Sequence, residues 1–150
     1  MSILKKILPP QIALIYLVVA FILNIFIKSN VVFNYNHKLL GAMTMAMGIL
    51  IMLWAWSLFR TSQTTLRPTR RPKKMMTAGP FEWTRNPMYL GIVLILSGIA
   101  CYMGSVIMFI APGAFFITIN AVYVPYEEKV LVKIFGEEYK RYQKRVRRWL

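Results

Sequence analysis

Three long runs of apolar residues constrain this chain more than any other feature of its sequence. They cover residues 11–27, 39–59 and 88–124. An α-helix needs about 20 predominantly apolar residues to cross the hydrocarbon core of a bilayer. The third run has 37 residues, which is too many for one span and enough for two. The pattern therefore predicts an all-α fold, a polytopic membrane protein with four transmembrane helices.

The third run has one good candidate for a turn, at residues 101–105, where Gly104 can adopt backbone conformations that other residues avoid. The four predicted spans are then about 11–27, 39–59, 88–102 and 105–124. Pro112 is expected to bend the fourth span. Four polar residues within or at the ends of the spans are expected to form hydrogen bonds between helices. These residues are Asn24, Ser57, Ser97 and Asn120.

The first run could also belong to a cleaved signal peptide, because Lys5 and Lys6 precede it. However, it is longer than the roughly 7–15 apolar residues of a typical signal, and no small-x-small cleavage site follows it. We therefore expect a retained span, and one membrane-embedded domain over residues 1–150.

Charge is distributed unevenly along the chain, which has a formal net charge of +14. Segment 60–87 holds seven basic residues and the tail 125–150 holds eight, whereas residues 28–38 hold two and the turn near Gly104 none. Positively charged loops stay in the cytoplasm. Both termini and the 60–87 loop are therefore predicted to be cytoplasmic. Basic residues flanking apolar runs also favour anionic membrane lipids as partners, and not nucleic acid.

All five acidic residues fall on the same predicted side, and no charged residue lies inside a span. An ion or proton pathway, including that of a four-helix multidrug exporter, would need such a residue. Polar chemistry is therefore expected at the cytoplasmic face. The acidic residues are Glu82, Glu127, Glu128, Glu137 and Glu138.

The tail has the spacing of a basic amphipathic helix, with a break expected after Phe135 because Gly136 follows it. Such a helix could anchor the last span at the membrane surface. It could equally fold back as a lid over the cytoplasmic ends of the helices. The apolar face consists of Leu131, Phe135, Tyr139, Tyr142, Val146 and Trp149.

Two segments are more specific than the rest. In residues 75–91, two chain-bending dipeptides seven residues apart enclose Phe81, Trp83 and Arg85. This is either a simple re-entry loop or a rigid loop that binds a small polar ligand. The second segment, residues 123–128, ends in Glu127 and Glu128. These acids could pair with the basic 60–87 loop or hold a cationic ligand.

Together these segments resemble the isoprenylcysteine carboxyl methyltransferase and phospholipid methyltransferase group, integral membrane enzymes that use S-adenosyl-L-methionine. The shared pattern is Gly-Pro-Phe-x-x-Thr-Arg-Asn-Pro-Met-Tyr-x-Gly, a hydrophobic helical hairpin, and Glu-Glu-x-x-Leu-x-x-x-Phe-Gly-x-x-Tyr-x-x-Tyr. It covers about residues 75–150, and the two motifs occur in the same order as in the family.

The resemblance implies roles for particular residues. Arg85 would orient cofactor or substrate and is the candidate catalytic residue. Glu127 and Glu128 match the paired acids that help to hold the cofactor. The resemblance implies no metal. The other residues expected to bind the cofactor are Gly79, Pro80, Phe81, Asn86, Pro87 and Tyr89.

Two positions depart from the pattern. The carboxyl methyltransferases usually have His where this chain has Asn86, and the phospholipid N-methyltransferases resemble Asn-Pro-Met-Tyr more closely. The phospholipid enzymes also have a Gly-x-Gly in the preceding helix, whereas here the nearest match is Ala46-Met47-Gly48. Gly48 is therefore only a weak cofactor candidate.

Methyl transfer needs alignment more than a protein nucleophile. Glu127 or Glu128 could hold the ammonium of the cofactor, Arg85 its carboxylate, and Phe81, Trp83 or tail aromatics its adenine. A lipid-borne acceptor would enter between the helices. It could be an isoprenylcysteine-type carboxylate or a phospholipid amine; the lack of a suitably placed His base mildly favours a carboxylate or thiol. The alternative is a non-enzymatic scaffold whose basic tail binds anionic lipid.

Overall fold

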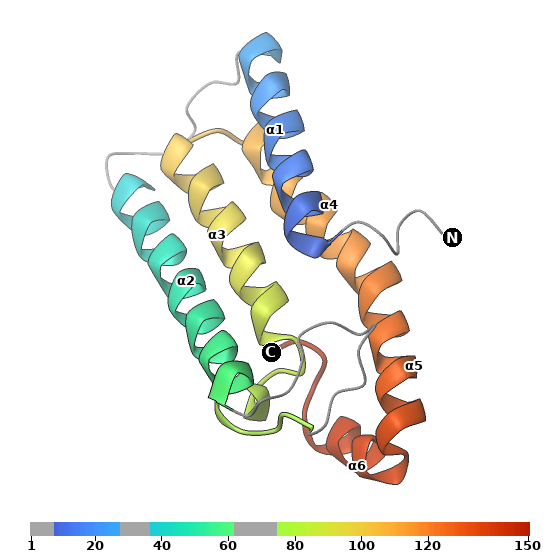
Figure 1. Ribbon diagram of the computed structural model, residues 1–150. Coiled ribbons are helices and arrows are strands. Elements are labelled where there is room, and N and C mark those ends of the chain that lie inside the picture. Colours follow the sequence, from blue (N-terminus) through green and yellow to red (C-terminus); the bar gives the residue numbers. More distant parts are fainter. Residues whose placement is uncertain (1–7, 28–36, 62–74) are drawn as a thin grey trace.

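The computed structural model describes residues 8–27, 37–61 and 75–150, and these fold into helices without any strand (Figure 1). The all-α prediction is therefore confirmed for the described residues. In chain order the elements are α1 (Pro9–Ile27), α2 (His37–Thr61), η1 (Gly79–Glu82), α3 (Pro87–Met103), η2 (Ile107–Phe109), α4 (Ile110–Thr118), η3 (Ile119–Tyr123), α5 (Val124–Phe135) and α6 (Glu137–Arg145).

Three helical stretches are long and apolar enough to cross a membrane. They are α1, α2 and the continuous stretch Ile107–Phe135, which has 29 residues. Helix α3 is apolar but has 17 residues, so the count of four spans stays a prediction. The predicted turn is present, because Gly104 caps α3 with φ of +67°. The predicted boundary of the last span at about residue 124 stays a prediction, while the helical stretch itself continues to Phe135.

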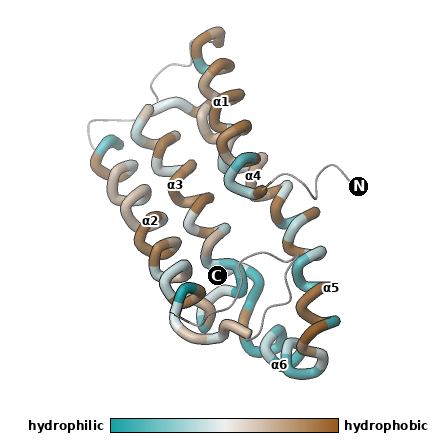
Figure 2. The backbone as a smooth tube through the Cα atoms, viewed as in Figure 1, coloured by the Kyte–Doolittle hydropathy of each residue, from teal (hydrophilic) through white to brown (hydrophobic). Residues whose placement is uncertain are grey.

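The helices pack as two antiparallel pairs, α2 against α3 and α1 against α4 (Figure 1). Successive helices run in opposite directions, so that the start of α1, the end of α2, the start of α3 and the end of α5 point toward the same side. Figure 2 shows apolar residues along α1, α2 and α4, and hydrophilic residues around α6 and the end of the chain. This segregation places the polar residues of the two specific segments together.

Glycines allow α2 and α3 to approach closely. A Cβ atom on Gly48 would lie 2.6 Å from the carbonyl oxygen of Gly91, and one on Gly98 would lie 2.7 Å from that of Gly41. Small residues at such crossings let helix backbones touch in a membrane, where burial of apolar surface does not drive association. The role of Gly48 in this structure is therefore helix packing, and it does not line the cavity described below.

The backbone of the last span becomes irregular at η3, a π-helical turn, directly before Pro125. A proline lacks the N–H that would bond one turn back, and a π turn inserts one extra residue into the helix. Pro112, by contrast, lies in the first turn of α4, after η2, where its missing N–H costs little. The bend expected at Pro112 stays a prediction.

Hydrogen bonds between helices occur among the apolar contacts. The hydroxyls of Tyr16 and Thr118 lie 2.8 Å apart, and the Ser105 hydroxyl donates to Asn24. The expected interhelical role of Asn24 is thus confirmed. Ser57 instead donates to the Trp54 carbonyl within its own helix. The fully buried core residues around these bonds include Ala20, Ala111, Phe115, Ile119 and Val124.

The tail breaks where the sequence predicted. Gly136 has φ of +54° and separates α5 from α6. The expected helix over Val146 and Trp149 is wrong, since α6 ends at Arg145 and Val146 is extended, with φ −118° and ψ 132°. The apolar face packs inward, because Tyr139, Tyr142 and Val146 form a buried cluster against residues that include Met75 and Leu131.

Candidate functional site

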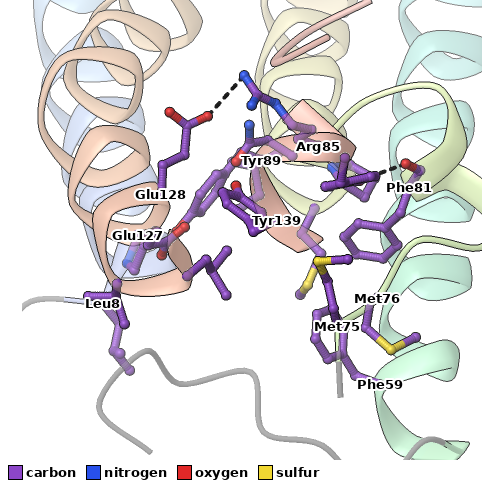
Figure 3. A pocket seen from close by; sticks show the side chains of 18 of the residues that line it. Leu8, Phe59, Met75, Met76, Phe81, Arg85, Tyr89, Glu127, Glu128 and Tyr139 are labelled. Carbon is purple, nitrogen blue, oxygen red and sulfur yellow. Dashed lines mark hydrogen bonds and ion pairs between the residues drawn. The ribbon is translucent and has the colours of Figure 1, made fainter. Parts of the chain in front are cut away.

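A cavity of about 400 Å³ lies where the ends of the helices converge (Figure 3). Small-molecule sites typically have volumes of roughly 300–1,000 Å³, so the cavity is large enough for a compact ligand. It brings together residues from both ends of the sequence. The lining residues are Leu8, Pro9, Pro10, Phe59, Met75, Met76, Phe81, Arg85, Asn86, Pro87, Met88, Tyr89, Ile92, Glu127, Glu128, Val130, Leu131, Tyr139 and Tyr142.

Most residues that the sequence singled out line this cavity. The two specific segments are far apart in the chain, yet the antiparallel packing places the start of α3 opposite α5 (Figure 1). Gly79 and Pro80 do not line the cavity. The predicted residues that do are Phe81, Arg85, Asn86, Pro87, Tyr89, Glu127 and Glu128.

Gly79 and Pro80 shape the loop that carries Phe81. Gly79 has φ of +63°, and a Cβ there would lie 2.9 Å from Leu58 and 3.3 Å from the Trp54 ring. A side chain at this position would therefore be strained as well as crowded. Pro80 is fully buried in η1. The loop is thereby fixed against the end of α2.

Glu127 faces the cavity from α5 and accepts a hydrogen bond from the Tyr89 hydroxyl at 2.6 Å. Tyr89 belongs to α3, so this contact joins the two specific segments (Figure 3). Among the described residues, Tyr89 is the one group that hydrogen-bonds Glu127, and no basic side chain pairs with it. Burial disfavours the ionised form of such a carboxyl group, and a cationic ligand beside it would stabilise that form.

Glu128 is paired with two arginines. Its Oε1 lies 3.1 Å from Nη2 of Arg85, and its Oε2 lies 2.7 Å from Nη2 of Arg148. The side chains of Arg85 and Glu128 are only 11% and 13% exposed. Nε of Arg85 is buried and lacks a hydrogen-bond partner among the described residues. The adjacent acids therefore have different surroundings, which the sequence did not distinguish.

Asn86 uses its side chain within the protein. Its Nδ2 donates to the carbonyl oxygen of Arg148 at 3.0 Å, and its backbone N–H donates to the hydroxyl of Thr84 at 3.2 Å. Pro87 begins α3 and is fully buried. An asparagine amide in this position serves as a donor to the chain itself and cannot act as a general base.

The opposite wall of the cavity is apolar. Phe59 and Phe81 pack edge to face with ring centroids 5.5 Å apart, and Met75 and Met76 lie beside them (Figure 3). Trp83, which was expected as an alternative adenine contact, is 60% exposed, packs on Trp54 and does not line the cavity. Phe81 is therefore the better placed aromatic.

Helix α6 closes the cavity with two tyrosines. The Tyr142 hydroxyl donates to the Phe81 carbonyl oxygen at 2.7 Å, and the Tyr139 ring packs on the Tyr142 ring. Burial raises the pKa of Tyr139 to about 12 and also raises the pKa of Tyr142 above its ordinary value. Both phenols are therefore protonated at neutral pH. Packing of the tail over the cavity is what the lid interpretation of the tail predicts.

The sequence did not predict that several further residues belong to the site. Thr84, Asn120, Arg148 and Trp149 form a hydrogen-bonded group beside Glu128. Thr84 lies inside the quoted motif, but Arg148 has no local signal because its partners are distant in sequence. The expected pairing of the acids with the basic 60–87 loop is confirmed for Glu128, which pairs with Arg85. Five of the seven basic residues of that loop, within 67–74, lie outside the described residues.

Comparison with known proteins identifies the family. A family model described as phospholipid methyltransferase matches residues 36–138. The chain is also 38% identical over 63 residues to an uncharacterised protein of Haemophilus influenzae; that match covers 42% of this chain and all of the other protein. No solved structure matches significantly. Because the family model spans more than half of the chain and includes both specific segments up to α6, the protein belongs to the phospholipid methyltransferase family.

Proposed function

We propose that this protein transfers a methyl group from S-adenosyl-L-methionine to a lipid-borne acceptor bound at the cavity. The observation that carries the proposal is the convergence of the two specific segments on one cavity. Arg85, Tyr89, Glu127 and Glu128 supply its polar wall, and aromatic and methionine side chains supply its apolar wall. Family membership supports methyltransferase chemistry on a membrane-associated substrate.

The residues present fit such a cofactor. S-adenosyl-L-methionine combines an ammonium and a carboxylate at one end with an aromatic base at the other. Glu127 lacks a cationic partner among the described residues, and Arg85 has a buried donor without an acceptor. Opposite charges and unsatisfied donors buried in a cavity favour a ligand that completes them. Phe81 and Phe59 would then receive the base.

When bound, the cofactor supplies an electrophilic methyl group on a sulfonium. The protein's contribution is positioning, since in-line displacement depends on holding two reactants in a near-attack arrangement. Arg85 and Glu127 would fix the polar end. Tyr139 and Tyr142, from α6, would exclude water from the cavity.

The acceptor is proposed to reach the cavity from the membrane. Leu8, Pro9 and Pro10 at the start of α1 line it, and the rest of α1 exposes large apolar side chains outward. An acyl or prenyl chain could therefore lie against apolar residues while its reactive group enters the polar region. Both an isoprenylcysteine-type carboxylate and a phospholipid amine fit this route. We further propose that the cavity faces the cytoplasm, where the cofactor is available.

The first experiment measures S-adenosyl-L-methionine binding by calorimetry with the purified protein in detergent. We expect binding by the unaltered protein and a loss of roughly tenfold or more in affinity for Glu127→Gln, because the ammonium loses its charged acceptor. Glu137→Gln is the control, since Glu137 is exposed on α6, pairs with Lys140 and does not line the cavity. Absence of binding by the unaltered protein contradicts the proposal.

A second experiment identifies the acceptor class. Membranes containing the protein are incubated with methyl-labelled cofactor, and the lipid extract is treated with mild base. A base-labile label indicates a methyl ester on a carboxylate, whereas a label retained in the lipid head group indicates an amine. If the lipid is labelled equally without the protein and with the Glu127→Gln variant, the result argues against lipid methylation by this protein.

A further inference from the structure

The end of the chain returns to the start of α3 instead of extending α6. The backbone N–H of Arg85 donates to the carbonyl oxygen of Arg147 at 3.0 Å. The carbonyl oxygen of Arg148 accepts two bonds, from the Thr84 hydroxyl at 2.9 Å and from the Asn86 side chain at 3.0 Å. Three consecutive residues before α3 are therefore tied to two consecutive carbonyl groups near the end of the chain.

The side chain of Arg148 makes a two-point contact with Glu128. Its Nε lies 3.2 Å from Oε1 and its Nη2 lies 2.7 Å from Oε2. Such a fork fixes the orientation of a carboxylate as well as neutralising it. On the other side, Asn120 accepts from Nη1 of Arg148 at 3.4 Å and from the Trp149 indole at 3.0 Å. Arg148 thus joins the η3 turn, α5 and the 84–86 segment.

This arrangement separates the roles of the two adjacent acids. Glu128 already faces two guanidinium groups, from Arg85 and Arg148, so it has little capacity left for a cationic ligand. Glu127 faces the cavity with only the Tyr89 phenol bonded to it among the described residues. One Nη atom of Arg85 contacts Glu128, whereas its buried Nε has no acceptor within the described part of the chain.

We propose that residues 146–149 form a clasp whose Arg148, acting through Glu128, positions Arg85 to bind the carboxylate of an amino-acid group, while Glu127 alone binds its ammonium. The inference rests on the proposed function and refines it. Arg148 is a positioning residue, since its contacts are with Glu128 and Asn120. The clasp lies beyond residue 138, where the match to the family model ends.

The test compares two ligands with the whole chain in detergent. One is S-adenosyl-L-methionine and the other is its decarboxylated form, which keeps the ammonium but lacks the carboxylate. We expect Arg148→Gln to weaken binding of the first roughly tenfold, to near the affinity of the second. Binding of the decarboxylated ligand should hardly change. Glu127→Gln should instead weaken binding of both ligands.

Arg141→Gln is the matched control. It removes the same charge from an exposed arginine of α6 that does not line the cavity, so affinity for both ligands should stay unchanged. Arg148→Lys should give an intermediate affinity for S-adenosyl-L-methionine, because lysine keeps the charge but not the fork. If Arg148→Gln does not fold, Arg148→Lys carries the same two-ligand comparison.

Two results would overturn the clasp proposal. One is equal weakening of both ligands by the Arg148 variants, accompanied by a lower Tm, which would mean that Arg148 only supports the fold. The other is unchanged affinity for both ligands in a folded Arg148→Gln protein. Failure of the unaltered protein to bind either ligand would instead reject the proposed function itself, and the clasp proposal with it.

Discussion

Tyr89 and Arg85 each connect the two specific segments at the cavity wall, Tyr89 through Glu127 and Arg85 through Glu128. The Tyr89 hydroxyl donates at 2.6 Å to Glu127, and α3 carries it to that position because Pro87 begins the helix two residues earlier. A buried carboxylate deprived of a hydrogen bond loses roughly 1–3 kcal/mol of stabilisation. The phenol therefore satisfies one oxygen of a carboxyl group that lies in a largely apolar environment.

We predict that Tyr89→Phe weakens S-adenosyl-L-methionine binding about tenfold, which corresponds to about 1.4 kcal/mol. The ring still fills its place, so the effect isolates the hydroxyl. Calorimetric titration in detergent measures it, with Tyr102→Phe as control because Tyr102 lies at the opposite end of α3 and is exposed. Equal affinities for the two variants would contradict the assigned role.

For single residues, the sequence predicted those members of the candidate site that lie in short local motifs. Phe81, Arg85, Tyr89 and the two glutamates lie in short, ordered patterns, so their convergence followed once antiparallel spans were assumed. The unequal pairing of Glu127 and Glu128 could not be predicted. It depends on Arg148, whose partners come from segments brought near it only by the fold.

Among the helices, α2 and α3 pack closely, because glycines where they cross let the two backbones approach each other. Adding a methyl group where a neighbouring carbonyl oxygen lies within 2.6 Å forces the helices apart. Such overpacking costs roughly 1–3 kcal/mol in a well-packed core. The effect should reach the site, because η1 packs on the end of α2.

We expect Gly48→Ala to lower the free energy of unfolding by about 1–3 kcal/mol, measured by denaturant titration in mixed micelles. Gly113→Ala is the matched control, because nothing lies within 4 Å of a Cβ added there. Replacing that helical glycine should be neutral or stabilising by up to about 1 kcal/mol. Equal destabilisation by both substitutions would contradict the packing argument.

Helix α6 should respond to alkaline pH. Its Tyr139 has a pKa raised from 10.0 to about 12 by burial, so above pH 10 the unfolded chain loses a proton that the folded protein keeps. Stability from this group is then complete below pH 10 and is lost as pH rises toward 12. Tyr139→Phe should show a shallower loss of Tm over that range. An unchanged slope would mean that Tyr139 does not contribute.

Three helices were predictable from hydropathy, because the ends of α1, α2 and α3 agree with the apolar runs to within a few residues. The third apolar run ends at residue 124, whereas the helix continues to Phe135. Helix α5 extends past Glu127 and Glu128, and both acids face partners or the cavity. The course of residues 146–149 could not be predicted from periodicity, because backbone bonds to distant residues override it.

For the whole molecule, α3 separates the cavity from the Gly104 turn, because the cavity is lined by the start of α3 and Gly104 caps its other end. If the positive-inside orientation holds, the cavity is cytoplasmic. Two single-cysteine proteins, both carrying Cys101→Ser, can test this. They are Glu137→Cys on exposed α6 and Val106→Cys, whose residue is 53% exposed beside the turn.

With a membrane-impermeant maleimide, right-side-out vesicles should label the Val106→Cys protein and inverted vesicles the Glu137→Cys protein. Labelling of both from the same side would mean that no span, or an even number of spans, separates the cavity from the turn. Labelling in the reverse pattern would place the cavity outside the cytoplasm. Detergent-solubilised protein, in which both cysteines should react, controls for accessibility.

The π-helical turn at η3 carries a consequence for sequence length. Each residue of an α-helix is rotated by about 100° from the one before it. The extra residue in this turn therefore sets the direction in which the side chains of α5 point. If residues Ile119 to Tyr123 formed a regular α-helix with the same number of residues, Glu127 would be rotated by about 100° away from Tyr89. A chain that places this acid pair in the same way must therefore either keep the π turn or have one residue fewer in a regular helix there, whatever side chains occupy it.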